Sequence, residues 1–207
     1  MMKRQTTDGK ELRFLRVEQI EVRAQTEEDQ GMQVSGYVVK WDTRSQLIWG
    51  YFYEKVAKGA FARALKENVI KALWNHRTDF VLGSTKSGTL RLQEDDVGLY
   101  FEIDLPENTW GRDAFESISR GDVDGVSFGF YIYEDGDTWE WIKDEGVYER
   151  TLLAINLFEI SPTPFPAYED ASEVSQRSLE RHGILSPEQR HEKEKIQLRI
   201  DLLGLGA

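Results

Sequence analysis

The sequence predicts a mainly β protein with short helices, of the α+β class, whose strands pair antiparallel. Most of its apolar segments are short and alternate apolar with polar residues, which is typical of half-buried strands. Acidic turns separate several of these segments, and helical spacing of apolar residues is confined to a few short stretches. With 207 residues, 40% of them hydrophobic, the chain can bury one core and carry appendages. Its strands would close on themselves or pack as a sandwich.

The first half of the chain contains three expected strands and a helix. Residues 17–24 alternate imperfectly, residues 33–41 are rich in β-branched and aromatic side chains with Gly36 as a bulge, and residues 47–55 are aromatic. Apolar residues then recur at helical spacing over residues 59–68, which predicts a helix of two to three turns.

The middle of the chain returns to strands. Residues 69–74 form an apolar strand that ends at His76, and residues 87–93 and 98–105 form a hairpin around an acidic turn. A helix follows at residues 110–120, with Thr109 as its N-cap and Gly121 as its end.

The last expected strands cover residues 125–133, 139–142 and 150–160. The proline-rich run at 161–166 cannot hold a helix or a central strand, because proline has no backbone donor. These elements divide the chain into a polar leader at 1–14, a main domain at 15–172 and a charged helical tail at 173–207.

Composition excludes several function classes. The chain has 26 Lys and Arg against 37 Asp and Glu, a net charge of −11, which argues against a nucleic-acid-binding module. It has no cysteine, so disulfides, thiolate catalysis and Cys-based zinc sites are excluded. Its three histidines are scattered, and we expect no metal and no cofactor. No apolar run approaches the roughly 18 residues of a transmembrane span, and no signal peptide is recognisable, so we expect a soluble protein made in a cytoplasm, without a membrane partner.

A serine with small neighbours stands at the centre of the strand 125–130. Val126, Phe128 and Phe130 share one face of this strand, whereas Ser127 and Gly129 share the other. Taken alone, the pattern is that of a core strand with a close-packed back. The small residues also leave room for a group to approach the hydroxyl.

Two other residues offer the chemistry that a serine needs. A serine is a weak nucleophile without an adjacent base, and His76 is the only histidine within the β-rich body. Glu159 is a carboxylate near the end of an apolar strand, where alternation by itself favours a solvent-facing side chain. Spacing does not join the three residues, because a catalytic triad is defined by geometry.

The chain resembles the prohead (capsid maturation) protease family of tailed bacteriophages over roughly residues 17–172. The motifs that carry the resemblance, in this order, are Gly36-Tyr37, Gly59-Ala60-Phe61, Asn75-His76, Leu82-Gly83-Ser84-Thr85, Ser87-Gly88-Thr89-Leu90, Gly121-Asp122-Val123, Val126-Ser127-Phe128-Gly129-Phe130, Leu157-Phe158-Glu159-Ile160-Ser161-Pro162 and Phe165-Pro166-Ala167-Tyr168. The family is similar in fold to the herpesvirus assembly proteases, which implies a closed antiparallel β-barrel flanked by helices.

The resemblance implies a serine endopeptidase with Ser127 as nucleophile and His76 as general base. The herpesvirus relatives use a second histidine as third member, and the matched region offers none, so we expect Glu159, with Asp122 and Asp124 as alternatives. Backbone N–H groups near Gly129, or the Arg150 side chain, would form the oxyanion hole.

The same resemblance implies the biological setting. The enzyme would cleave the scaffold segment of the major capsid protein, and itself, during virion assembly, as an oligomer inside the prohead in the cytoplasm of a bacterial host. The alternative is a catalytically silent β-barrel scaffold or minor capsid component that acts by binding.

Overall fold

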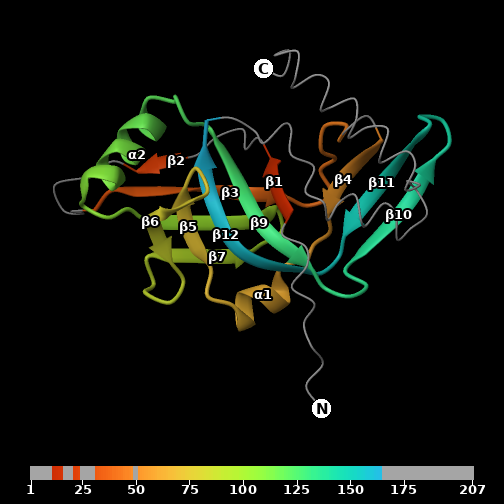
Figure 1. Ribbon diagram of the computed structural model, residues 1–207, viewed down its shortest axis with the longest axis horizontal. Coiled ribbons are helices and arrows are strands. Elements are labelled where there is room, and N and C mark those ends of the chain that lie inside the picture. The colour runs from red at the N-terminus through yellow and green to blue at the C-terminus, as the bar shows by residue number, and fades with distance from the viewer. Residues whose placement is uncertain (1–10, 16–20, 24–30, 49–50, 165–207) are drawn as a thin grey trace, which may run out of the picture. The chain divides into compact units, whose positions relative to one another are not determined.

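The computed structural model describes residues 11–15, 21–23, 31–48 and 51–164, and these residues form three β-sheets and two short helices (Figure 1). The expected tail at 173–207 and residues 1–10 of the expected leader lie outside the described residues. The sheet that carries the candidate site has five strands in the order β1 (Glu11–Leu15), β9 (Gly125–Ile132), β12 (Ile155–Thr163), β5 (Lys71–Trp74) and β6 (Arg77–Ser84). Its pairs are antiparallel except for the parallel pair β12–β5.

The other two sheets have four and three strands. The four-stranded sheet is antiparallel, in the order β2 (Glu21–Arg23), β3 (Gln33–Lys40), β8 (Gly98–Asp104) and β7 (Leu90–Glu94). The three-stranded sheet has the order β10 (Asp137–Ile142), β11 (Val147–Leu152) and β4 (Phe52–Val56), and its pair β11–β4 is parallel. The helices are α1 (Ala62–Glu67) and α2 (Thr109–Ser119).

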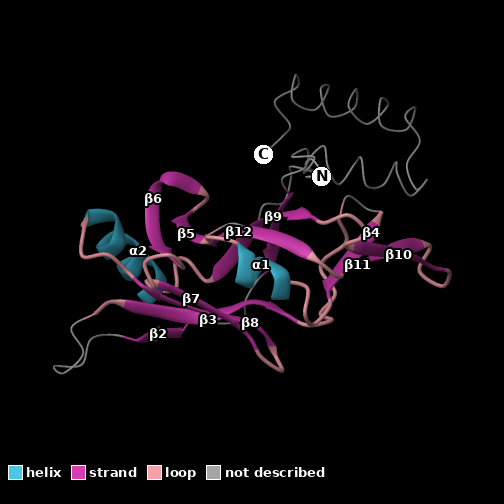
Figure 2. Cartoon of the chain, turned by 90° about the horizontal axis from the view of Figure 1, so that it is seen from below, coloured by secondary structure: helices cyan, strands magenta, loops and turns pink. Residues whose placement is uncertain are grey.

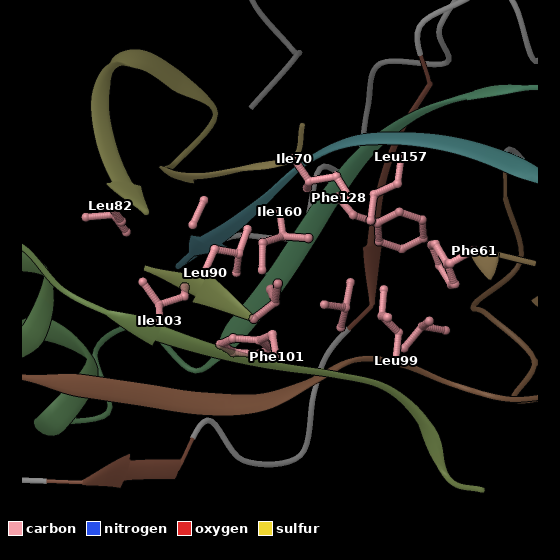
Figure 3. Close-up of a cluster of buried hydrophobic side chains, with 14 of the residues drawn as sticks. Phe61, Ile70, Leu82, Leu90, Leu99, Phe101, Ile103, Phe128, Leu157 and Ile160 are labelled. Atoms are coloured by element: carbon pink, nitrogen blue, oxygen red, sulfur yellow. The ribbon is translucent and has the colours of Figure 1, made fainter. Parts of the chain in front are cut away.

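The main core lies between the five-stranded and four-stranded sheets, which form two layers in Figure 2. Because strand side chains alternate, one face of each sheet is apolar and meets the other. Figure 3 shows the buried side chains that meet there, with Phe128, Leu157 and Ile160 from one sheet and Leu99, Phe101 and Ile103 from the other. The opposite face of the five-stranded sheet is therefore free to carry polar side chains, and the candidate site lies on it.

The expected closed antiparallel barrel is wrong, although the mainly β class with few helices is confirmed. Among the described residues the strands form separate sheets, and two pairs, β12–β5 and β11–β4, are parallel. Alternation along a strand shows which face is buried, but it does not show which strand lies beside it. Barrel closure and the mixed pairing therefore could not be obtained from the sequence pattern.

Several expected boundaries also need correction. Residues 11–15 form β1, paired with β9, so the expected loose leader does not extend to residue 14. The register shift in β3 lies between Tyr37 and Val39, and Gly36 is not the bulge. Asn108, rather than Thr109, is the N-cap of α2, because its side chain accepts a hydrogen bond from Gly111 N–H at 2.9 Å.

The single strand expected at 150–160 is two strands, β11 and β12. The N–H groups of Leu153 and Ala154 both donate to the Gly136 carbonyl, at 2.7 and 3.0 Å, and the chain passes from one sheet to another there. β6 was not expected. It begins at Arg77, with only two residues between it and the end of β5, and the sequence pattern predicted no strand at residues 77–84.

Pro162 corrects the expectation that the proline-rich run cannot enter a central strand. β12 continues through Pro162 to Thr163, paired with β9, whereas its ladder with β5 ends at Ile160. On that side the Pro162 carbonyl accepts a hydrogen bond from Asn75 N–H at 3.1 Å. The N and C=O of a strand residue point to the same side, so the missing proline donor falls where the β5 ladder has already ended.

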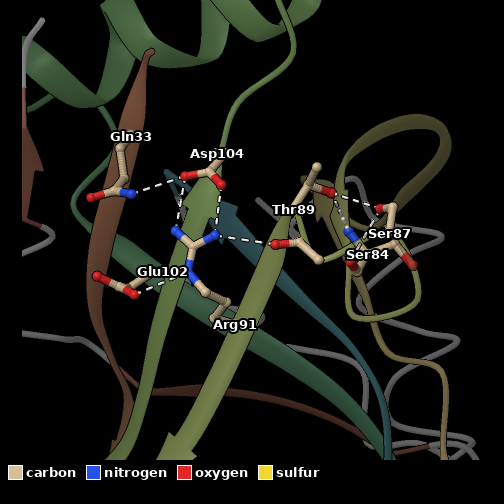
Figure 4. A network of polar contacts seen from close by, with 8 residues as sticks. Gln33, Ser84, Ser87, Thr89, Arg91, Glu102 and Asp104 are labelled. Carbon is tan, nitrogen blue, oxygen red and sulfur yellow. Dashed lines mark hydrogen bonds and ion pairs between the residues drawn. The ribbon is translucent and has the colours of Figure 1, made fainter. Parts of the chain in front are cut away.

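A polar network lies on the four-stranded sheet and beside the turn that follows β6 (Figure 4). The Arg91 guanidinium contacts Asp104 at 2.6 and 2.9 Å and Glu102 at 3.1 Å. The Arg91 hydrogen bond lowers the pKa of Asp104 below its usual range. The Thr89 hydroxyl accepts a hydrogen bond from Ser84 N–H at 3.0 Å. These contacts join β7 and β8 and close the turn.

Candidate active site

His76 occupies a two-residue hairpin turn between β5 and β6. Trp74 and Arg77 are register partners, so Asn75 and His76 alone connect the strands. Both have positive φ, 49° and 60°, as a type I′ turn requires. Asparagine and histidine adopt this region more often than most residues, but a non-glycine residue there still costs about 1–3 kcal/mol, which neighbouring contacts must offset. The sequence therefore places the imidazole in a strained turn.

The end of β12 holds this turn through three hydrogen bonds. Asn75 N–H donates to the Pro162 carbonyl at 3.1 Å, and the Thr163 hydroxyl donates to Asn75 Oδ1 at 2.6 Å. His76 N–H donates to Ser161 Oγ at 3.2 Å. The proline-rich run is thus the segment that fixes the position of His76.

Glu159 lies beside the imidazole. A bulge between Leu157 and Glu159 shifts the phase of β12, so the Phe158 and Glu159 side chains both lie against Gly129 of β9. Glu159 Oε1 is 2.7 Å from His76 Nδ1, and the carboxylate side chain is 3% exposed. The expectation that Glu159 faces solvent is wrong, because its side chain lies on the face away from the core but is buried there against Gly129 and the His76 ring.

The carboxylate fixes the tautomer of the imidazole. An ionised carboxylate only accepts hydrogen bonds, so Nδ1 carries the proton and Nε2 of the neutral ring keeps its lone pair. Nε2 of His76 is buried and makes no hydrogen bond to the part of the chain that the structure describes. The ring is therefore set to take a proton at Nε2.

Gly129 provides the space for this carboxylate. A Cβ built on Gly129 would lie 2.5 Å from Glu159 Oε1 and 2.6 Å from Phe158 Cζ. The expectation that the small residues leave room for a group to approach the Ser127 hydroxyl is therefore corrected at Gly129, since Glu159 and Phe158 occupy the room there.

Ser127 lies on the same face of β9 as Gly129, two residues away. It is fully buried, and its register partner on β12 is Ser161. Directly opposed residues of an antiparallel pair have Cβ atoms about 4.5–5.5 Å apart. Ser161 in turn donates its hydroxyl proton to Glu159 Oε2 at 2.6 Å. The structure thus brings Ser127, His76 and Glu159 to one region of the sheet, with a direct contact between the last two.

The hydrogen bond between Ser127 and His76 is not formed in this structure, because Nε2 has no partner within the described residues. In resting enzymes the contact between a nucleophile and its base is often long and tightens only when substrate binds.

The alternative residues lie in other surroundings. Asp122 is exposed and pairs with Arg120 at 3.1 Å, and Asp124 is also exposed. Arg150 is fully buried in the three-stranded sheet, where it contacts Glu54 at 3.0 Å and Asp137 at 2.8 Å. Its guanidinium is engaged in these ion pairs, which favours a structural role over an oxyanion hole.

Sequence reasoning missed Ser161 as a residue of the site, and it missed Asn75 and Thr163, whose hydrogen bond supports the turn. Their signal was weak, because hydroxyl residues between prolines are also ordinary turn chemistry. Within the described residues, no group of three or more His, Cys, Asp or Glu side chains could hold a metal ion. No helix in that same part of the chain is long and apolar enough to cross a membrane.

A histidine with its Nδ1 on a buried carboxylate, and a serine on the strand beside the one that carries the carboxylate, is the kind of arrangement found in serine hydrolases. Residues 18–184, more than half of the chain, match the family of caudovirus prohead serine proteases. The chain belongs to this family. This places it among the serine proteases of phage proheads.

A solved structure has a similar fold. The capsid assembly protease of bacteriophage T4 aligns with a TM-score of 0.50 and 11% identity, over 75% of this chain and 98% of the T4 chain. At this identity the likeness concerns the fold alone. No curated protein sequence matches the chain.

Proposed function

We propose that the chain is a serine endopeptidase in which Ser127 is the nucleophile, His76 the general base and Glu159 the residue that orients the imidazole. The observation that carries the proposal is the 2.7 Å contact between His76 Nδ1 and the buried Glu159 carboxylate. This contact fixes the tautomer and would stabilise the imidazolium that forms when the ring takes a proton.

The reaction follows from these roles. As Ser127 Oγ attacks the scissile carbonyl carbon, its proton passes to His76 Nε2, and a tetrahedral intermediate forms. Its collapse breaks the C–N bond, and the imidazolium returns the proton to the leaving amine. A water molecule, deprotonated by the same nitrogen, then attacks the acyl-enzyme. The ester bond to Ser127 Oγ breaks, the imidazolium returns its proton to that oxygen, and the second product leaves.

The hydrogen bond of the Ser161 hydroxyl argues against Ser161 as the nucleophile. The proton of the Ser161 hydroxyl is donated to Glu159, a hydrogen bond at 2.6 Å to an acceptor that is ionised in this mechanism. An attack by Ser161 would break that bond and disturb the carboxylate that orients His76. The prediction that backbone N–H groups near Gly129 form the oxyanion hole stays a prediction.

The substrates would be capsid proteins. Membership of the prohead protease family, and the fold shared with a phage capsid assembly protease, support cleavage of the scaffold segment of the major capsid protein. Self-cleavage and oligomeric assembly inside the prohead belong to the same proposal.

Co-expression with the major capsid protein of the same phage, followed by mass spectrometry of the products, tests the function. Wild type should release defined fragments, whereas Ser127→Ala and His76→Ala should lower the rate by about 10⁴-fold or more. Ser117→Ala, at a half-buried serine of α2 whose hydroxyl donates to the Asp113 carbonyl of the same helix, is the matched control and should cleave as wild type does. A folded Ser127→Ala variant that still cleaves would contradict the assignment. A folded wild type that binds capsid protein without cutting it would favour the alternative binding role.

A further inference from the structure

We propose that Ser161 is a positioning residue of this active site, whose hydroxyl holds the Glu159 carboxylate and the His76 backbone in one arrangement. The catalytic consequence rests on the proposed function. The geometric part of the proposal concerns only the side chains of Ser161, Glu159 and His76 and the hairpin turn that contains His76.

The Ser161 hydroxyl links the two residues that act on each other. It donates to Glu159 Oε2 at 2.6 Å and accepts from His76 N–H at 3.2 Å. Meanwhile the other carboxylate oxygen, Oε1, contacts the His76 ring at Nδ1. The three contacts form a closed ring of hydrogen bonds from the His76 backbone through Ser161 and Glu159 to the His76 imidazole.

Burial makes this ring rigid. Ser161 is fully buried and the Glu159 side chain is 3% exposed, so water has little access to replace either hydrogen bond. A buried polar group that loses its partner keeps the cost of desolvation and must find another partner or move. Without the Ser161 hydroxyl, Glu159 Oε2 would lose its donor, and rotation of the carboxylate would become possible.

The backbone contact acts on a residue that needs support. His76 has a φ of 60°, which a non-glycine residue adopts only when neighbouring contacts hold it. Its N–H has Ser161 Oγ as acceptor, in the segment that also holds Asn75. Removal of the hydroxyl would therefore loosen the turn and the carboxylate together, and both determine the position of His76 Nε2.

A simple structural role for Ser161 would be to satisfy the turn, and Thr163 offers a control for that role. The Thr163 hydroxyl supports the same turn from the same strand, by donating to Asn75 Oδ1 at 2.6 Å. The Thr163 hydroxyl thus donates to Asn75, whereas the Ser161 hydroxyl donates to Glu159. Thr163→Val removes a turn hydrogen bond of similar burial and leaves the contacts of the carboxylate in place.

The experiment compares Ser161→Ala, Ser161→Thr and Thr163→Val in the full chain. One readout is the downfield proton resonance of the His76 imidazole N–H, assigned by its loss in His76→Ala. The other is the kcat and KM on a peptide that spans a cut site of the wild-type enzyme. Circular dichroism at the assay temperature shows that each variant is folded, and Ser161→Cys replaces Ser161→Ala if the latter does not fold.

We expect Ser161→Ala to shift or lose the imidazole resonance and to lower kcat by about 10- to 100-fold, with KM within about twofold, because a shift of about 1 Å in a catalytic group can cost that much. Ser161→Thr, which keeps the hydroxyl, should restore the resonance and most of kcat. Thr163→Val removes one hydrogen bond of the turn and none of the carboxylate, so it should keep the resonance and lower kcat by no more than about threefold, a smaller loss than in Ser161→Ala.

Two results would overturn the proposal. One is a Ser161→Ala variant with wild-type kcat and an unmoved resonance. The other is a Thr163→Val variant as impaired as Ser161→Ala, which would assign the effect to the turn alone. If wild type cleaves no peptide, the proposed function fails, while the resonance in the variants still decides whether Ser161 positions the pair.

Discussion

Gly129→Ala tests whether the site depends on the space beside Glu159. The added Cβ would lie 2.5 Å from Oε1, about 0.9 Å short of the 3.4 Å at which ordinary van der Waals contact begins. The Phe158 ring atoms would lie at 2.6 and 2.7 Å. Phe158 is only partly buried and its ring can turn away, whereas Glu159 is held by His76 and Ser161. The carboxylate oxygen must therefore move by nearly 1 Å.

A displacement of that size has two measurable consequences. Misplacement of a catalytic group by about 1 Å costs on the order of 100-fold in rate. Overpacking a filled region lowers the free energy of unfolding by about 1–3 kcal/mol. The rate is measured on the cleavage peptide, and the free energy of unfolding by urea denaturation followed by circular dichroism.

Gly83→Ala is the matched control for steric strain without displacement of the carboxylate. Gly83 is buried in β6 of the same sheet, and its added Cβ would meet Thr89 O at 2.9 Å and Ile103 Cγ2 at 3.2 Å. This variant should be destabilised but keep the kcat of wild type in its folded fraction. If Gly129→Ala instead keeps wild-type kcat, the view that Glu159 is pinned against Gly129 is refuted.

Further predictions concern the turn, the buried ion pairs and the helix cap. In the strained turn, His76→Gly should be more stable than His76→Ala by about 1 kcal/mol in urea denaturation, because glycine accepts positive φ; equal stabilities would contradict the strain. Arg150→Met should lower the free energy of unfolding by about 3–5 kcal/mol, since two buried carboxylates lose their cation, and a loss below about 1 kcal/mol would speak against this role. Asn108→Ala should cost about 1 kcal/mol through loss of the α2 cap, a cost that unchanged thermal stability would exclude. The hydrogen bond from Lys55 lowers the pKa of Glu149, so its contribution to stability is present above the unfolded pKa of about 4.3 and is lost as pH falls through the lower folded pKa. In Glu149→Gln the free energy of unfolding, measured by urea denaturation between pH 7 and pH 3, should fall less steeply with falling pH than in wild type. An equal fall in both proteins would show that Glu149 does not contribute to this pH dependence.

Local pattern alone predicted most of the strands and the identity of the candidate residues. The alternation around Ser127 placed Phe128 in the core and Ser127 on the opposite face, and the structure agrees. The helices, the hairpin of β7 and β8, and the positions of β5 and β9 likewise follow from periodicity and turn residues. These features depend on residues that are close in the sequence, and therefore local sequence patterns predict them.

The arrangement of the site depended on contacts between distant segments. Glu159 reaches His76 because a bulge at Phe158 shifts the phase of β12, and no residue type near Phe158 signals that bulge. The space beside Gly129 was expected to be open, but the same bulge places Glu159 and Phe158 in it. A central strand was not expected at Pro162, because proline lacks a backbone donor. β12 can include Pro162 because the Asn75–His76 turn, and not a further strand residue, lies beside it.

The sequence by itself determined which residues can react, because a chain without cysteine and with one histidine in its β-rich body leaves few candidates for hydrolysis. It also determined that Ser127 lies on the side of its strand away from the core. Only the tertiary structure decided which carboxylate contacts His76, that two of the three sheets in the described residues are mixed, and that Ser161 contacts both residues. The physical reason is that alternation fixes the face of a side chain, whereas strand pairing and register fix its neighbours, and these are set by contacts far apart in the chain.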